Sequence, residues 1–169
     1  MYTLSETSLK MLKGVHPNLV NFMTELIKIS PWDFKITAGV RTAAEQNLEY
    51  QKGRTAPGAK VTNVDGYRLK SNHQIKFDGL GYAADIGVLV KEKVKVSVME
   101  NGKKVEKVIE KDVYKGTWKD FHYYQDIYDT AKKAGLLEKY GIEWGGNCWK
   151  TFKDAPHWQI KGADRVPYK

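Results

Sequence analysis

The chain has 169 residues, 41% of them hydrophobic, and a formal net charge of +8, which is typical of one globular domain and excludes a wholly disordered protein. No apolar run reaches the roughly 20 residues needed to cross a bilayer, and no basic and apolar leader opens the sequence, so we expect folding in the cytoplasm. Cys148 is the only cysteine, which excludes an internal disulfide and leaves histidines and carboxylates as metal ligands. The positive charge attracts polyanions without choosing among nucleic acid, envelope polymers and lipid surfaces.

The first third of the chain predicts helices around one strand. Ser5 is a suitable N-cap for a first helix, and Pro17 suits the first turn of a second one. A strand is expected over residues 34–38 and a helix over residues 43–52, closed by a glycine. Arg41 therefore stands at a strand-to-helix junction.

The middle of the chain predicts a long loop and then strands. Residues 54–70 are rich in Gly, Pro, Asn and Asp and show no periodicity, which indicates a loop. A strand is expected around Asp85, and valines that alternate on either side of Asn101-Gly102 predict a β-hairpin over residues 91–115. This hairpin holds eight lysines and five acidic residues, so we expect a basic insertion.

The last third predicts one helix and two short strands. A capping-box pattern at residues 117–120 begins a helix that Gly135 ends. Strands are expected over residues 142–144 and 157–160. The order of elements predicts an α+β fold over residues 1–169, a single compact domain with helices packed on a small antiparallel sheet.

Two histidines stand in sequence contexts typical of metal ligands. On a strand, Asp85 shares its face with two small residues, which clears space around the carboxylate. His157 projects to the side opposite Trp158, and His73 follows the long loop. These three side chains can converge, and two imidazoles plus one carboxylate leave zinc a fourth position for water, as in catalytic sites.

A metal-activated water also needs a group that takes its proton. Asp154, three residues before the second histidine ligand, suits this role. Glu143 is the alternative base. Arg41 can stabilise the negative charge that develops on a carbonyl oxygen. Ser71 and Trp158 are further candidates to contact the substrate or to support the ligands.

Three sequence pieces carry a resemblance to a known family: Ser71-x-His73, Gly81-x-Ala83-x-Asp85 and Asp154-x-x-His157. They resemble the zinc peptidases of the D-alanyl-D-alanine carboxypeptidase and L-alanyl-D-glutamate endopeptidase family, whose fold is like that of hedgehog proteins and D,D-peptidases and which includes phage endolysins. The resemblance implies that His73, Asp85 and His157 bind one catalytic Zn²⁺. It also implies that Asp154 is the acid/base residue and that Arg41 helps to hold the carbonyl during attack.

One spacing departs from the family pattern. The family usually places the ligand aspartate seven residues after the first histidine, whereas Asp85 follows His73 by twelve. The extra residues resemble an insertion at 75–79, which loop entropy tolerates because loop length costs little free energy. Asp78 within it is a rival ligand, but Asp85 keeps the frame of small residues and is preferred.

The resemblance implies a peptidoglycan hydrolase, a zinc-dependent L-alanyl-D-glutamate endopeptidase of phage or prophage endolysin character. A D-alanyl-D-alanine carboxypeptidase or dipeptidase of the same family and a non-catalytic basic binding module are the alternatives. We expect a monomer that stays in the host cytoplasm until lysis and reaches the periplasm and cell wall through a holin-type membrane opening. No nucleic-acid motif is found, so no specific nucleic-acid partner is expected.

Overall fold

The structure is a computed structural model that describes residues 1–149 and 152–169. Its helices are α1 (Glu6–Met11), α2 (Pro17–Ile29), α3 (Ala43–Gln51), α4 (Phe121–Lys133) and α5 (Leu136–Tyr140), and its strands are β1 (Asp33–Ala38), β2 (Ala83–Glu100), β3 (Lys103–Lys115), β4 (Ile142–Trp144) and β5 (His157–Ile160). The predicted α+β class is thereby confirmed. Within these two stretches, no helix has the length and apolar character that a membrane span requires.

The strands form one antiparallel sheet in the order β1-β2-β5-β4, and β3 pairs with the distal part of β2. The proximal part of β2 is central, because it pairs with β1 on one side and with β5 on the other. In this register Asp85 on β2 lies directly opposite His157 on β5. Two residues from distant parts of the sequence are thus neighbours on the same face of the sheet.

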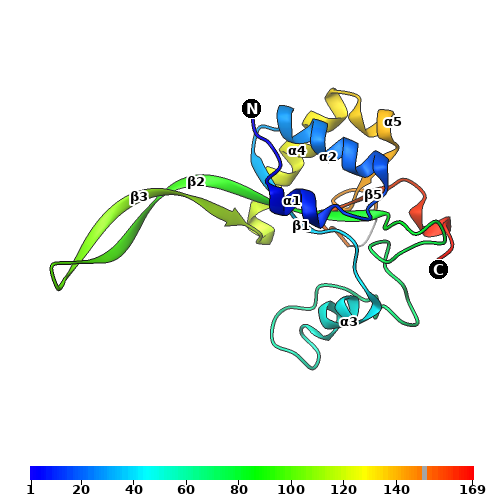
Figure 1. The fold of residues 1–169 in the computed structure, drawn as a ribbon, viewed down its shortest axis with the longest axis horizontal. Coiled ribbons are helices and arrows are strands. Elements are labelled where there is room, and N and C mark those ends of the chain that lie inside the picture. Colours follow the sequence, from blue (N-terminus) through cyan, green and yellow to red (C-terminus); the bar gives the residue numbers. More distant parts are fainter. Residues whose placement is uncertain (150–151) are drawn as a thin grey trace.

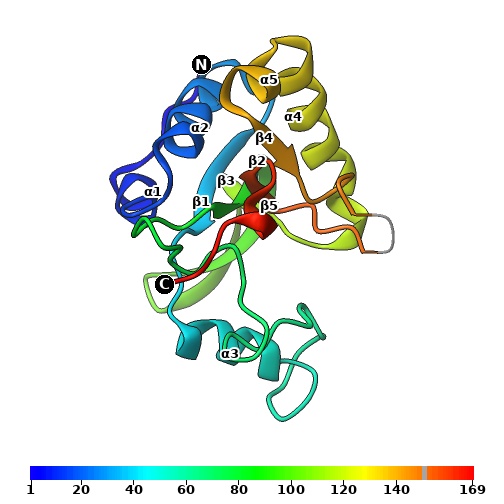
Figure 2. The same ribbon diagram turned by 90° about the vertical axis from the view of Figure 1, so that its right-hand side faces the viewer.

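Helices cover one face of the sheet. Figures 1 and 2 show α1, α2, α4 and α5 on one side, and α3 with the long loop on the other. Ile86 and Val88 of β2 point into the covered side and are fully buried there. Trp158 lies in the same core, with its ring centroid 5.3 Å from that of Phe22. Because side chains alternate along a strand, Asp85 faces the other side, where it is available to a site.

Local sequence signals account for most helix ends. The Ser5 hydroxyl accepts a hydrogen bond from the Ser8 N–H, and Pro17 occupies the first turn of α2. The capping box of Thr117 and Asp120 forms in a short 3-10 turn (Trp118–Asp120) just before α4. Gly135, at a φ of 70°, ends α4 as expected, but α5 then begins at once and was not predicted. A helix of five residues is too short to show a helical period.

The strand around Asp85 and the predicted hairpin are one continuous element. β2 runs for 18 residues without interruption, because no turn-forming residue separates Gly87 from Lys91. The hairpin turn lies at Asn101-Gly102 as predicted, and both residues have positive φ, 49° and 76°. Such a turn matches the twist of the two strands. The hairpin extends away from the rest of the domain as a long arm (Figure 1).

Candidate metal centre

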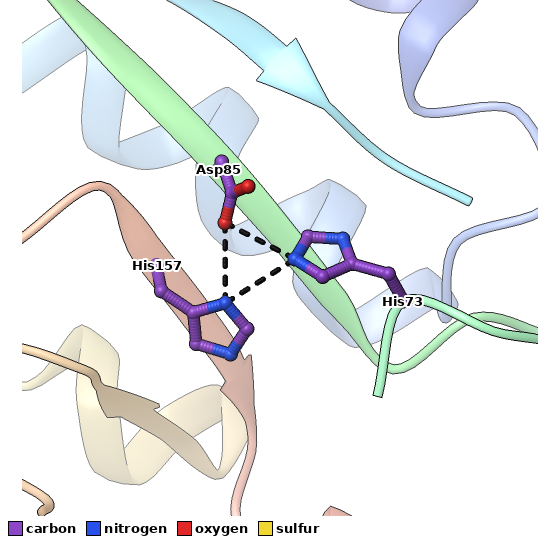
Figure 3. A group of neighbouring side chains, drawn as sticks. All are labelled: His73, Asp85 and His157. Carbon is purple, nitrogen blue, oxygen red and sulfur yellow. Dashed lines mark hydrogen bonds and ion pairs between the residues drawn. The ribbon is translucent and has the colours of Figure 1, made fainter. Parts of the chain in front are cut away.

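Three side chains meet beneath the centre of the sheet (Figure 3). The Oδ1 atom of Asp85 lies 3.1 Å from Nε2 of His73 and 3.1 Å from Nδ1 of His157. The two imidazole nitrogens lie 3.2 Å from each other. Pairing of β2 with β5 positions Asp85 and His157, and the loop that precedes β2 brings in His73. The structure therefore brings together the three ligands that the sequence suggested.

The second nitrogen of each imidazole is bound by an acceptor. Nδ1 of His73 lies 2.8 Å from the backbone carbonyl of Gly39, and Nε2 of His157 lies 2.9 Å from Oε1 of Gln159. A carbonyl oxygen only accepts, so these two nitrogens carry the protons. Gly39 has no room for a side chain, since a Cβ there would lie 2.0 Å from the Met11 carbonyl oxygen. Both remaining lone pairs then face the Asp85 carboxylate.

This donor set fits a zinc ion. Two lone pairs that face each other at 3.2 Å repel unless a proton or a metal ion lies between them. Tetrahedral zinc with ligands at about 2.0–2.1 Å requires ligand atoms roughly 3.3 Å apart. The observed separations of 3.1 and 3.2 Å are close to this value. His73, Asp85 and His157 could therefore hold one metal ion, with acceptors behind both imidazoles as metal sites require.

Burial and charge act against each other in this cluster. Burial raises the pKa of Asp85, but the charges and hydrogen bonds of the two histidines outweigh it and hold that pKa well below its usual value. Burial also lowers the pKa of His73, more than the Asp85 carboxylate raises it. For His157, burial lowers the pKa, yet its hydrogen bond and charge interaction with Asp85 leave the pKa raised overall. An ionised Asp85 is the state that binds a metal.

Arg41 contacts the ligand carboxylate itself. Its Nη2 atom donates to Oδ2 of Asp85 at 2.6 Å, and its backbone N–H donates to the His73 carbonyl at 3.0 Å. Its Nη1 atom donates to Oε1 of Gln46 at 3.3 Å. Arg41 thus holds the outer oxygen of Asp85, which turns the inner oxygen toward the imidazoles. This contact was not foreseen from the sequence, which suggested only a role in stabilising the reacting carbonyl.

A pocket of about 470 Å³ is connected to the cluster through Arg41, although none of the three candidate ligands lines it. Arg41 forms part of its wall, together with Tyr67, Lys70 and Gln74 from the long loop and the segment that follows it. Arg41 therefore contacts the Asp85 carboxylate and borders this space at the same time. The arrangement places a basic wall next to the candidate metal ligands.

The two candidate bases differ in their surroundings. Burial, and next the charge of Asp85, raise the pKa of Asp154 to about 6. No side-chain hydrogen bond of Asp154 is found among residues 1–149 and 152–169. The Glu143 carboxylate, in contrast, accepts a hydrogen bond from Nε2 of Gln159 at 2.6 Å. Within the described residues, the two carboxylates therefore differ in that only Glu143 has a side-chain hydrogen bond.

The remaining sequence candidates lie outside the cluster. The Ser71 hydroxyl accepts from the backbone N–H of His73 at 3.3 Å and so shapes the turn that carries this ligand. Trp158 is completely buried in the core, on the opposite face of β5, which leaves its side chain no surface for substrate. That it supports the ligands stays a prediction. Asp78 accepts from the Tyr82 hydroxyl at 2.8 Å and is not part of the cluster.

A buried polar network behind His157 was missed by the sequence reasoning. Oε1 of Gln159 also accepts from Nδ2 of Asn72 at 2.9 Å, and Oδ1 of Asn72 accepts from Nζ of Lys76 at 2.8 Å. Lys76 is fully buried, and burial lowers its pKa to about 8. Its Nζ atom lies 3.3 Å from the ring centroid of Tyr168. The only sequence signal was strand alternation, which places Gln159 on the same side as His157.

Known proteins of one kind are similar to this chain. A model of the family described as "Phage L-alanyl-D-glutamate peptidase" matches residues 1–116, which include Arg41, His73 and Asp85 but end before β5. The peptidoglycan L-alanyl-D-glutamate endopeptidase CwlK of Bacillus subtilis (strain 168) is 30% identical over 128 residues, 76% of this chain and 60% of that protein. The chain thus spans about three fifths of the length of that curated relative.

One solved structure is similar over nearly the whole chain. The crystal structure of the L-Ala D-Glu endopeptidase ChiX of Serratia marcescens matches with a TM-score of 0.59 and 25% sequence identity. The match covers 97% of this chain and 94% of that chain. The similarity therefore extends well beyond residue 116, where the match to the family model ends.

Proposed function

The chain belongs to the phage L-alanyl-D-glutamate peptidase family, and from this premise we propose that it is a zinc-dependent peptidoglycan endopeptidase. Its substrate is the stem peptide, and the bond that it cleaves is the amide between L-alanine and D-glutamate. The observation that carries the proposal is the triangle of His73, Asp85 and His157, whose ligand atoms lie within 4.8 Å of one another. In a member of this family, such a donor set is expected to serve catalysis.

Different residues of this chain are assigned to metal binding and to proton transfer in amide hydrolysis. His73, Asp85 and His157 would hold a zinc ion, which when bound would supply the Lewis-acid chemistry that activates water at neutral pH. The Asp154 carboxylate removes a proton from the attacking water and delivers it to the departing amine nitrogen. A pKa of about 6 suits both steps, since Asp154 is ionised at pH 7 and still basic enough to accept a proton.

Arg41 is assigned two connected roles. It orients Asp85 through the 2.6 Å contact to Oδ2, and it presents positive charge to the adjacent cavity. The carbonyl oxygen of the scissile amide gains negative charge during attack, and a fixed cation beside the metal ligands lowers the energy of this state. Neither role requires a covalent intermediate.

The wider setting follows from the same premise. We infer that residues 1–169 act as one zinc peptidase domain, a monomer, with residues 91–115 as an inserted hairpin. Peptidoglycan is the partner, and no specific nucleic acid is required. An enzyme of this kind that is made in the host cytoplasm needs a holin-type opening of the membrane to reach the periplasm and cell wall.

The test is mass spectrometry of the soluble products released from purified Gram-negative peptidoglycan, with zinc-loaded and chelator-treated protein compared. Stem peptides that begin at D-glutamate, released only with zinc, are the expected result. Loss of a terminal D-alanine would instead assign a carboxypeptidase. Absence of any product with zinc present would favour the basic binding module.

A further inference from the structure

The arm formed by the distal part of β2 and by β3 is a two-stranded ribbon. Pairing of β2 with β1 stops at Leu89, and pairing with β5 stops at Asp85. Beyond these points β2 pairs with β3 alone in the described part of the chain. Figure 1 shows the ribbon leading away from all the helices. A ribbon of this kind buries little apolar surface of its own.

One face of the ribbon, here called the lysine-valine face, follows from the register, since directly paired residues share a face. On β3 it consists of Lys103, Val105, Lys107, Ile109, Lys111, Val113 and Lys115, and on β2 it consists of Glu92, Val94, Val96, Val98 and Glu100. Val94, Val96 and Val98 form an apolar stripe along β2, which Ile109 and Val105 extend on β3, and a lysine recurs at every fourth position of β3. At about 3.3 Å per residue, neighbouring lysines stand about 13 Å apart.

The lysine-valine face is the continuation of the core face of β2. Ile86 and Val88 lie on the same side of this strand and are buried beneath the helices. Val90 is the last residue of β2 that packs against the core of the described chain, and Figure 1 shows no helix over the projecting arm. Ile109 is consequently 42% exposed. The apolar stripe is therefore not explained by packing within the domain.

The two faces of the ribbon differ in charge. On the opposite face Lys91 pairs with Asp112 and Lys93 pairs with Glu110. With Lys95, Lys104 and Glu106, that face holds four lysines against three acidic residues in all. The lysine-valine face holds four lysines against two glutamates. Lys107 and Lys115 form ion pairs with Glu100 and Glu92, which leaves Lys103 and Lys111 without an ion pair among the described residues. The lysine-valine face therefore carries the larger net charge, +2 against +1 on the opposite face.

We propose that the lysine-valine face is a docking surface for an anionic lipid bilayer. The valine stripe enters the boundary between headgroups and acyl chains, while the long lysine side chains reach outward to the phosphates. A second copy of the chain would bring the same positive face, and like charges repel. A nucleic acid would use the lysines but leave the valine stripe exposed to water. A bilayer with anionic headgroups satisfies both halves of the pattern.

Vesicle co-sedimentation of the full chain tests this surface without any measurement of hydrolysis. Vesicles of phosphatidylcholine mixed equally with phosphatidylglycerol are compared with vesicles of phosphatidylcholine alone. We expect the protein to partition at least tenfold more strongly onto the anionic vesicles, with binding that weakens as salt is added because the charges are screened. Equal binding to both vesicle types, or binding to neither, would overturn the proposal.

Two triple variants that lose the same charge distinguish binding through the lysine-valine face from attraction by net charge alone. Changing Lys103, Lys107 and Lys111 to Gln removes three charges from the lysine-valine face, and changing Lys91, Lys93 and Lys95 to Gln removes three from the opposite face. A lysine close to an anionic surface contributes about fivefold to binding, so the first triple should weaken partitioning on the order of a hundredfold. The second should change it much less, since its lysines lie on the far side of the ribbon. If both triple variants lost binding equally, the attraction would depend on net charge alone, and the proposed docking face would be refuted.

The apolar stripe has its own matched pair of variants. Val96→Ser combined with Val98→Ser removes two members of the stripe, and Val108→Ser changes a residue of the opposite face that is 61% exposed. The double variant should weaken vesicle binding about tenfold with its charge unchanged, and the control should bind as the native protein does. Far-UV circular dichroism checks that each variant keeps its strands. A double variant that keeps its strands and binds normally would contradict insertion of the stripe.

Discussion

The side-chain carbonyl of Gln159 accepts the proton on Nε2 of His157 at 2.9 Å. Gln159 cannot turn its amide around, because its Nε2 donates to Glu143 at 2.6 Å and its Oε1 also accepts from Asn72 at 2.9 Å. The orientation of one amide therefore determines which nitrogen of His157 keeps a free lone pair. That nitrogen, Nδ1, is the one that faces Asp85.

Gln159→Leu should weaken zinc binding about 10–100-fold, the usual cost of losing a hydrogen-bond partner behind a ligand histidine. Leucine has a similar volume, but it cannot accept the proton on Nε2, so His157 populates both tautomers. Competition with a chromophoric chelator measures the affinity. Nitrogen NMR of the metal-free protein should show the tautomer mixture at His157 and no change at His73, whose partner is Gly39. A single unchanged tautomer in the variant would contradict this account.

Removal of zinc should lower the thermal stability. An ion that binds only the folded state stabilises it by about 2.7 kcal/mol at one hundred times its Kd, which corresponds to about 5–10 °C in Tm for a domain of this size. Differential scanning calorimetry with and without chelator measures the shift. His73→Ala should abolish the response to zinc.

His16→Ala and His122→Ala are the matched controls for metal binding, since neither residue belongs to the cluster. Both variants should keep the full zinc-dependent rise in Tm. Loss of that rise in either control would place a ligand outside the proposed site.

Local sequence signals predicted the elements because the forces behind them are local. Asn101-Gly102 marks a turn that needs two positive φ angles, and the strands at 142–144 and 157–160 have the bounds that were expected. The short helix α5 escaped prediction because five residues give no period. The sequence suggested two strands where β2 is one. Its first half is almost continuously buried, whereas its projecting half alternates between part-buried and exposed residues, and the two halves therefore have different sequence patterns.

The candidate site was predictable in part. The residue types around His73, Asp85 and His157 resembled a family pattern, but their convergence depends on the register of β2 with β5, which is a long-range property. The ion pair between Arg41 and Asp85 joins residues that are far apart in the sequence. No periodicity or motif carries such a contact, so the sequence suggested a role for Arg41 toward the substrate alone.

Arg41→Ala should therefore affect two quantities. Zinc affinity falls because Oδ2 of Asp85 loses its 2.6 Å partner, and kcat at saturating zinc falls by about 10²–10³ if the guanidinium also stabilises charge on the substrate carbonyl. Arg41→Lys keeps the charge but loses the planar pair of donors, so it should recover part of the affinity. Full kcat at saturating zinc in the alanine variant would leave Arg41 as a positioning residue only.

Replacing each of the two carboxylates, Asp154 and Glu143, by its amide should show which of them transfers the proton. Asp154→Asn should lower kcat by about 10²–10⁴, the usual contribution of a general acid/base, while zinc binding is retained. Glu143→Gln should keep most activity, since an amide oxygen can still accept from Gln159. The reverse result would assign proton transfer to Glu143.

The stability of the metal-free Asp154→Asn variant should depend on pH. The pKa of Asp154 is about 6 in the folded protein and about 3.9 in an unfolded chain, so the folded state binds this proton more tightly. Its contribution to stability is complete below about pH 4 and is lost as the pH rises through about 6. Asparagine does not titrate, so relative to the native protein the variant should gain up to about 3 kcal/mol between pH 4 and pH 8. Urea unfolding of both proteins at several pH values measures this gain, and a difference that does not change with pH would show that Asp154 is not destabilised by burial and by Asp85.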